Sequence, residues 1–309
     1  MCDSTCYGKG LEMAPLSKKQ FDILDLLAQE GAPLTQRKME EYTGYSLGLI
    51  NKTVKELTDA GAICKGQITQ DGLNMLEPYR AKRAVILAAG FGTRMVPLTL
   101  NTPKPLIRVH GKRIIDSQID ACLAVGIEEI YIVRGYLAEQ FDQLLYKYPM
   151  VKFIENPVYN ETNNISSLMC ARYLLQNAYV FEADILIHDP KLIKKYHYQS
   201  NYLGIYRERT DDWCLTVKDG IITEQKVGGL NCYQEIGISY WNQEDGSRLA
   251  EDVKNAYELP GGREIFWDQA VFSMYKEHYQ VAVRACKDED IVEIDTFNEL
   301  KMIDPVYNV

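Results

Sequence analysis

The spacing of apolar residues changes near residue 80 and divides the chain into two predicted parts. Over residues 17–80, apolar side chains recur every three or four positions, as on one face of a helix. From Arg83 onward, short apolar runs of strand length alternate with helical spacing, which is typical of an α/β domain. We predict a small helical domain at 15–80 and an α/β domain at 81–309. Residues 1–14 have no periodic pattern and are expected to be a disordered leader.

Three short helices are predicted in the small domain. Ser17, Thr35 and Ser46 are good N-caps for them, and Gly31 and Gly44 are expected to end the first two. Residues 61–69 could form a minimal β-wing, and residues 69–79 a closing helix. This order of elements resembles the winged helix-turn-helix of bacterial repressors.

The charge of the small domain supports DNA binding only in part. Its third helix would present Asn51, Lys52 and Lys55 to phosphates or base edges. However, residues 1–80 hold nine Lys and Arg against eleven Asp and Glu, whereas DNA-binding domains usually carry a basic stripe. We favour a module for protein interaction, homodimer formation or regulation, and DNA binding stays an alternative.

The second part begins with a strand and a glycine-rich loop. The run Val85–Leu87 predicts the buried first strand of a parallel sheet. Gly90 and Gly92 then allow the backbone to come close to a ligand, and the free N–H groups of such a loop form a cradle for anions. Arg94 and Lys104 add positive charge. The loop is therefore predicted to hold phosphates.

Two familiar phosphate-binding loops do not match this one. A dinucleotide fingerprint requires a third glycine where Met95 stands, and a P-loop requires Gly-Lys-Ser/Thr at residues 93–95. What remains is Leu-Ala-Ala-Gly-x-Gly-Thr-Arg-Met-x-Pro followed by Pro103-Lys104-Pro105. This pattern resembles the signature of the nucleoside-triphosphate transferase family. Its members transfer NMP from an NTP to a phosphorylated sugar or alcohol and release pyrophosphate.

Two carboxylates interrupt a later apolar run at residues 179–187. Glu182 and Asp184 have the same parity, so in a regular strand they would share one face. In the family that the chain resembles, the second acid of such a segment binds Mg²⁺ together with a much later acid. The resemblance assigns these positions to Asp184 and Asp295. Two carboxylates suit Mg²⁺, which takes its other ligands from water and substrate phosphates.

Tryptophans beside acids suggest the second substrate. Two of the three tryptophans of the chain adjoin an aspartate, in Asp212-Trp213 and in Trp267-Asp268. Aromatic faces with a carboxylate are the chemistry of a quaternary-ammonium site. An ordinary structural role for these rings stays open.

The whole second part resembles the bacterial CTP:phosphocholine cytidylyltransferases of the choline-decoration pathway. The matching segments are 101–104, 135–141, 159–168, 206–208, 267–268 and 293–295, together with Trp213. The resemblance implies that Trp213 and Trp267 flank a trimethylammonium group whose charge Asp268 balances. Glu182 stands where an aspartate is common. Phe266 replaces a tyrosine of some relatives, which could shift the preference toward a smaller amine.

The resemblance also implies a fold and a set of site residues. The fold is an α/β doubly wound mixed sheet of the nucleotide-diphospho-sugar transferase type. Catalysis is assigned to Arg94, Lys104 and Asp184, and the metal Mg²⁺ to Asp184 and Asp295. Nucleotide binding is assigned to Leu87, Ala88, Ala89, Gly90, Gly92, Thr93, Arg94, Asn163, Asn164 and Ser167, and acceptor binding to Tyr136, Trp213, Glu264, Trp267 and Asp268. An acceptor phosphate oxygen would attack the α-phosphorus of CTP in line, with Arg94 holding the leaving pyrophosphate.

Composition and charge limit the class of protein and its expected location in the cell. The chain has 309 residues, 46% of them hydrophobic and 25% charged, with a net charge of −9, which disfavours broad binding to nucleic acid or membrane surfaces. Neither a signal region nor a membrane-spanning run is evident. The eight scattered cysteines lack a CxxC pair, which predicts free thiols and a cytoplasmic location.

Three alternatives stay open. A sugar-1-phosphate nucleotidyltransferase would share the loop and both metal acids but would not need the aromatic and acidic cluster. A GT-A glycosyltransferase could use Glu182-Ala-Asp184 but leaves the 90–94 loop and Lys104 without a role. A transcriptional regulator with a nucleotidyltransferase-like sensor is the third, although intact Lys104, Asp184 and Asp295 favour an enzyme.

Overall fold

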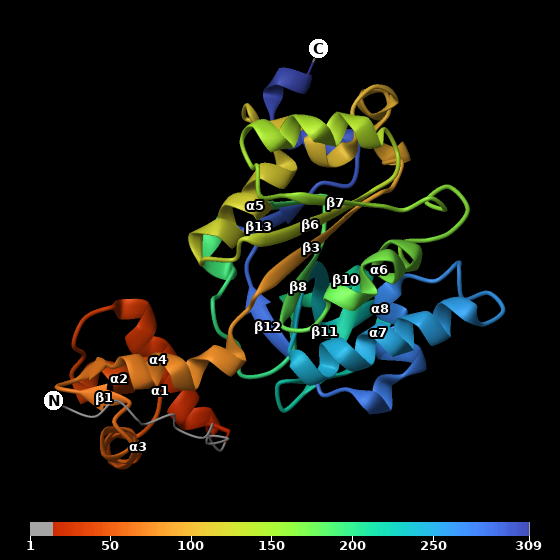
Figure 1. Cartoon of the computed structure of the whole chain (residues 1–309). Helices are drawn as coiled ribbons and strands as arrows, with labels where there is room; N and C mark the ends of the chain where they lie inside the picture. Colours follow the sequence, from red (N-terminus) through yellow and green to blue (C-terminus); the bar gives the residue numbers. More distant parts are fainter. Residues whose placement is uncertain (1–14, 309) are drawn as a thin grey trace, which may run out of the picture. The chain divides into compact units, whose positions relative to one another are not determined.

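The computed structural model describes residues 15–308, so the leader expected at 1–14 lies outside the described residues. Contacts within the chain form two compact units, and the boundary lies between Arg80 and Ala81. Figure 1 draws both units, and each has a core of its own. Within residues 15–308, no helix has both the length and the apolar character needed to cross a bilayer.

Within residues 15–80, the N-terminal unit contains four α-helices and a two-stranded antiparallel sheet. They are α1 (Lys18–Glu30), α2 (Gln36–Thr43), α3 (Leu47–Asp59), β1 (Ile63–Cys64), β2 (Gln67–Ile68) and α4 (Gln70–Leu76). Ser17 forms a capping box, and the side chains of Thr35 and Ser46 accept backbone hydrogen bonds at the next two helix starts. Gly31 and Gly44 end α1 and α2 with left-handed dihedral angles. The predicted helices are confirmed, and the winged-helix assignment stays a prediction.

A mixed seven-stranded sheet forms the centre of the second unit. Its strands are β3 (Arg83–Ala88), β6 (Glu129–Arg134), β7 (Lys152–Glu155), β8 (Ala178–Glu182), β10 (Asn201–Lys218), β11 (Ile221–Trp241) and β12 (Ala282–Cys286). Strands β8, β3, β6 and β7 lie side by side and are parallel, while β11 runs antiparallel to β8. The predicted α/β mixed sheet is confirmed.

Helices cover both faces of this sheet, as Figure 1 shows. Alternate residues of β3 point to opposite faces, so Ala84 and Ile86 join one hydrophobic cluster and Val85 and Leu87 another. The first cluster includes α5 (Ile114–Ala124) and the 3-10 segment at 138–146. The second includes α6 (Ile165–Ala171), α7 (Gln243–Glu258) and α8 (Trp267–Gln269). Burial on both faces explains why β3 is apolar from Ala84 to Ala88.

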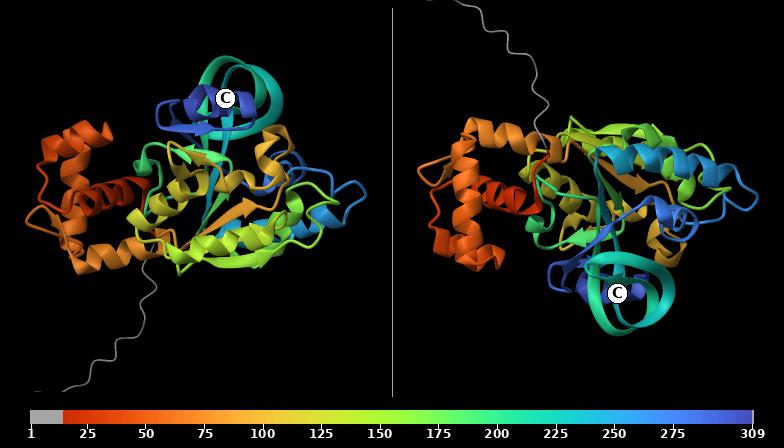
Figure 2. Two further views of the ribbon diagram at one scale, coloured as in Figure 1. Left: turned by 90° about the horizontal axis from the view of Figure 1, so that it is seen from above. Right: turned by 90° about the horizontal axis from the view of Figure 1, so that it is seen from below.

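The long strands β10 and β11 form a hairpin that folds back on itself. Cys214 and Leu215 pair both with residues 225–226 and with residues 233–234 of β11. Figure 2 shows the resulting curl end-on. The curl brings residues 212–213 of β10 and residue 235 of β11 to the same cavity.

One detail of the predicted elements is wrong. The run at 179–187 is not one regular strand, because β8 ends at Glu182 and the chain turns before β9 (Ile185–Ile187) begins. Strand β9 pairs with β13 (Ile291–Glu293) in a separate small sheet. Glu182 and Asp184 therefore lie close together because the chain turns after Glu182, and not because they share one face of a regular strand.

Candidate active site

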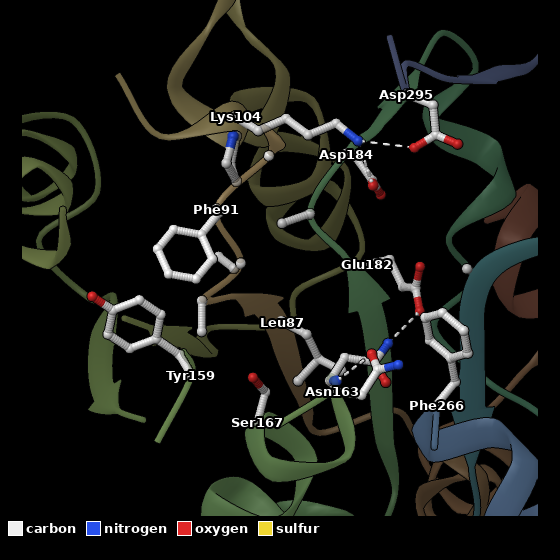
Figure 3. A pocket seen from close by; sticks show the side chains of 18 of the residues that line it. Leu87, Phe91, Lys104, Tyr159, Asn163, Ser167, Glu182, Asp184, Phe266 and Asp295 are labelled. Carbon is white, nitrogen blue, oxygen red and sulfur yellow. Dashed lines mark hydrogen bonds and ion pairs between the residues drawn. The ribbon is translucent and has the colours of Figure 1, made fainter. Parts of the chain in front are cut away.

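A cavity of about 750 Å³ lies at the carboxyl ends of β3 and β8. Ligands bind at this edge in open α/β sheets because the strands end there and the loops diverge. Figure 3 shows Lys104, Asp184 and Asp295 at one end of the cavity and Leu87, Asn163 and Ser167 at the other.

The loop after β3 is held in place by close packing. Gly92 has a φ of 62°, and a Cβ atom there would lie 3.0 Å from the Cβ of Lys104 and 3.0 Å from the Cγ2 of Thr99. Thr99 donates a hydrogen bond to the Gly92 carbonyl at 2.9 Å, and Met95 is fully buried beneath the loop. Only glycine satisfies both the dihedral angle and the packing at this position.

Lys104 is the central cation of the cavity. Its Nζ atom lies 2.8 Å from Oδ2 of Asp184 and 3.0 Å from Oδ1 of Asp295, and its side chain is 11% exposed. Burial alone would lower the pKa of Lys104, but the two carboxylates reverse the effect and raise it, so the amine stays charged. Arg94 donates to the same Oδ1 of Asp295 at 2.7 Å. The structure thus brings together four residues predicted for catalysis and metal binding.

A cluster of three carboxylates adjoins this lysine. Glu182, Asp184 and Glu293 each offer an oxygen atom within 4.8 Å of the others, and Oδ1 of Asp184 is buried without a hydrogen-bond donor. Burial, followed by the charges of Asp184 and Asp268, raises the pKa of Glu182 to about 8. Burial and Asp184 likewise raise the pKa of Glu293.

Hard oxygen atoms in this arrangement fit Mg²⁺, because a divalent cation would relieve their repulsion. The expected metal pair was Asp184 and Asp295. In the structure, Asp184 belongs to the three-carboxylate cluster, whereas Asp295 is held by Lys104 and Arg94.

Polar side chains on the opposite wall are fixed by hydrogen bonds. Asn164 donates to Oε1 of Glu182 at 3.1 Å and accepts from the backbone N–H of Trp267 at 3.0 Å. Asn156, which is 2% exposed, donates to the hydroxyls of Ser166 and Ser167 at 2.8 and 3.1 Å. These bonds fix the orientation of the side chains on this wall.

The third wall combines aromatic rings with acids and comes from the hairpin and α8. Its rings are Tyr202, Trp213 and Phe266, and its buried acids are Glu235 and Asp268. The rings of Trp213 and Phe266 meet edge to face with centroids 6.0 Å apart.

Most predicted site residues line this one cavity. They are Leu87, Ala88, Ala89, Gly90, Gly92, Thr93, Arg94, Lys104, Asn163, Asn164, Ser167, Asp184, Trp213, Asp268 and Asp295. Three acceptor-binding predictions do not line it. Trp267 is 1% exposed and stacks on Tyr202 with centroids 6.1 Å apart, Tyr136 packs against Phe91 beside the cavity, and Glu264 is exposed outside it.

Sequence reasoning gave no role to several residues that line the cavity. They include Phe91, Asn156, Tyr159, Tyr202, Glu235 and Glu293. Glu293 lies two residues before Asp295, and residues two apart in a strand point to the same face. This spacing could have predicted that Glu293 lies beside Asp295. Tyr202 and Glu235 lie in long strands without a motif, and only the fold of the hairpin places them.

Comparison with known proteins identifies the family. Residues 83–204 match the protein family described as "Nucleotidyl transferase". The chain is 39% identical over 228 residues to the 2-aminoethylphosphonate cytidylyltransferase of Lancefieldella rimae, an alignment that covers 72% of this chain and 92% of that protein. The chain belongs to the nucleotidyltransferase family. This confirms the family and the enzyme class expected from the phosphate loop.

Other relatives of this nucleotidyltransferase differ in their acceptors. The choline-phosphate cytidylyltransferase of Streptococcus pneumoniae is 34% identical, with 72% of this chain and 97% of that protein aligned. The CTP:phosphoglutamine cytidylyltransferase of Campylobacter jejuni is 38% identical, with 69% and 92% aligned. A solved structure of the phosphocholine cytidylyltransferase from Streptococcus pneumoniae superposes with a TM-score of 0.68 at 34% identity and covers 74% of this chain and 99% of that one. The inositol-1-phosphate CTP transferase of T. maritima, at 16% identity and a TM-score of 0.60, shares the fold.

Proposed function

We propose that this nucleotidyltransferase transfers CMP from CTP to a small phospho-amine, of the class that includes phosphocholine and 2-aminoethylphosphonate, and releases pyrophosphate. The observation that carries the proposal is one cavity with a phosphate loop and Lys104 at one end and buried acids with aromatic rings on another wall. The names of the similar cytidylyltransferases support CTP as the donor and a phosphorylated or phosphonylated amine as the acceptor.

The chain's own residues supply positioning and positive charge. Free N–H groups of the loop at 90–94 bind the triphosphate, and Arg94 holds the leaving pyrophosphate. Lys104 lies beside the reacting phosphates, where its charge offsets the negative charge that builds up during transfer. An acceptor phosphate or phosphonate oxygen attacks the α-phosphorus in line. No protein nucleophile is needed, because the acceptor is already an anion.

Glu182, Asp184 and Glu293 are the residues that would hold Mg²⁺, with Asp295 next to them. When bound, Mg²⁺ would neutralise charge on the phosphates. Gln118 supports this group by donating from Nε2 to the carbonyls of Glu182 at 2.8 Å and Ile185 at 2.9 Å. These bonds fix the turn that carries Asp184.

Pyrophosphate release tests the proposal. The full chain with Mg²⁺ is assayed with CTP or UTP against phosphocholine, phosphoethanolamine, 2-aminoethylphosphonate and glucose-1-phosphate. We expect turnover with CTP and one or more of the amines. Turnover confined to glucose-1-phosphate would refute the acceptor class, and a preference for UTP would refute the donor.

The N-terminal unit is proposed to be a winged helix with a regulatory or interaction role. Asn51, Lys52 and Lys55 of α3 are exposed, but the unit lacks the basic excess that phosphate contacts require. A gel-shift titration of the full chain with genomic DNA fragments tests this, and we expect no specific complex. A salt-resistant, sequence-specific complex would replace the proposal with a DNA-binding one.

A further inference from the structure

We propose that the acceptor amine carries N–H donors, as a primary ammonium does, and that Glu235 and Asp268 accept hydrogen bonds from those donors. This inference rests on the proposed function and narrows its acceptor class. It places N-methylated amines, with phosphocholine at the extreme, among the poorer substrates.

Each of two buried carboxyl groups has one oxygen atom without a hydrogen-bond partner. Asp268 lies in the short helix α8, is 8% exposed and lines the cavity, and its Oδ1 atom is buried without a partner. Glu235 accepts from Nε2 of Gln225 at 2.8 Å with Oε2, but its Oε1 is also buried without a partner. Among residues 15–308, no lysine or arginine forms an ion pair with either carboxylate.

The two carboxyl groups also adjoin one another. Burial and the charge of Asp268 raise the pKa of Glu235, and burial raises the pKa of Asp268. Two adjacent buried carboxylates repel unless a proton or a cation lies between them. An ammonium group bound here could balance the pair and donate to both unpaired oxygens at once.

The type of amine follows from the donors it offers. A primary ammonium has three N–H groups, whereas a trimethylammonium group has none and would leave Oδ1 of Asp268 and Oε1 of Glu235 unsatisfied. A buried acceptor left without a donor is costly, and sites built for hydrogen bonds reject analogues that lack the donor. The two carboxyl groups therefore discriminate against methylation.

The aromatic rings of the same wall do not form an open cage for a trimethylammonium group. Trp213 and Phe266 contact each other edge to face at 6.0 Å, so no space for a trimethylammonium group lies between them. Trp267, the expected second wall of a cage, stacks on Tyr202 and is buried. The rings of this wall therefore pack against each other and do not form a cage with space for a ligand between them.

A methylation series tests the inference. Purified full chain with CTP and Mg²⁺ is assayed for pyrophosphate release with phosphoethanolamine and its N-methyl, N,N-dimethyl and N,N,N-trimethyl forms. We expect kcat/KM to fall at each step, by about 100-fold or more over the series. Equal or better use of phosphocholine would overturn the inference and leave the proposed function intact. No release with any member, or with 2-aminoethylphosphonate, would overturn both.

Variants locate the discrimination. In Asp268→Asn and Glu235→Gln, kcat/KM for phosphoethanolamine should fall about tenfold or more while that for phosphocholine changes less, because the amide replaces one acceptor oxygen and weakens the charge-assisted hydrogen bonds that only the N–H donors make. Asp219→Asn removes an exposed carboxylate at the tip of the same hairpin and should leave the ratio unchanged. An unchanged ratio in both buried-site variants would contradict the assignment to these residues, and the wild-type series decides the inference even if both fail to fold.

Discussion

Replacing Lys104 by methionine removes the charge at the centre of the site and keeps much of the side-chain volume. The amine holds Asp184 and Asp295 at 2.8 and 3.0 Å. Without it, these carboxylates face each other and the neighbouring acids Glu182 and Glu293 with no cation except Arg94 nearby. We expect the variant to lose activity and stability together.

The structure gives the size of both effects. A hydrogen bond to a charged group contributes about 1.5–3 kcal/mol, so the two bonds of Lys104 amount to about 3–6 kcal/mol. Solvent reaches Asp184 and Asp295, whose side chains are 20% and 24% exposed. Screening lowers the expected loss in the free energy of unfolding to about 2–4 kcal/mol. Loss of a preorganised charge beside the reacting phosphates should reduce kcat by about 10²–10³.

Urea unfolding in EDTA and pyrophosphate release at saturating substrates measure these two quantities. Mg²⁺ should restore part of the lost stability, because it can replace the missing positive charge among the carboxylates. Lys287→Met is the matched control, since that lysine is 74% exposed and pairs weakly with Glu289 at 3.5 Å. A Lys104→Met enzyme with kcat within about threefold of wild type would refute the electrostatic role of this residue.

Three further predictions follow from the site and its packing. Burial raises the pKa of Glu182 from 4.5 to about 8, so between these pH values the folded chain holds a proton that the unfolded chain releases. In EDTA, the free energy of unfolding should therefore fall as the pH rises from 4.5 to 8, and it should fall less steeply in Glu182→Gln. A free energy of unfolding that rises over this pH range would contradict the raised pKa of Glu182. Gly92→Ala should cost about 2 kcal/mol in urea unfolding, because it adds the 3.0 Å contacts to the penalty of a positive φ, and Gly111→Ala, with φ 83° and open space, should cost about half of that. Trp267→Ala should destabilise the core by about 3–5 kcal/mol in urea unfolding, whereas Trp213→Ala should mainly raise the KM for the acceptor. If Trp267→Ala instead raised the KM and Trp213→Ala instead destabilised the fold, Trp267 would line the cavity and Trp213 would belong to the core.

The phosphate loop and its partners could be predicted because their signals are local. A strand, two glycines and two basic residues lie within a short stretch, and each has a physical reason to be there. Asp184 and Asp295 could be assigned by resemblance, and Lys104 joins them in the structure. The helices of the N-terminal unit were likewise readable from their caps.

The third wall of the cavity, with its aromatic rings and buried acids, could not be predicted in the same way. Trp267 and Asp268 are neighbours in the sequence, but successive residues of a helix point about 100° apart, so both rarely face one cavity. Here Asp268 lines the cavity and Trp267 enters the core. Tyr202 and Glu235 line the same cavity because the long hairpin curls. Neither residue lies in a sequence motif that would predict this position.

The ion pair between Arg94 and Asp295 joins residues 201 positions apart in the chain. Strand β13, which carries Glu293, pairs with β9 in the small sheet beside Asp184. A ribosome must therefore synthesise the chain as far as Asp295 before the cavity can acquire its full set of charges. Loops of this span close slowly, so catalytic competence should be among the last properties to emerge during refolding. Enzyme activity would then report complete folding of the second unit more faithfully than helix content does.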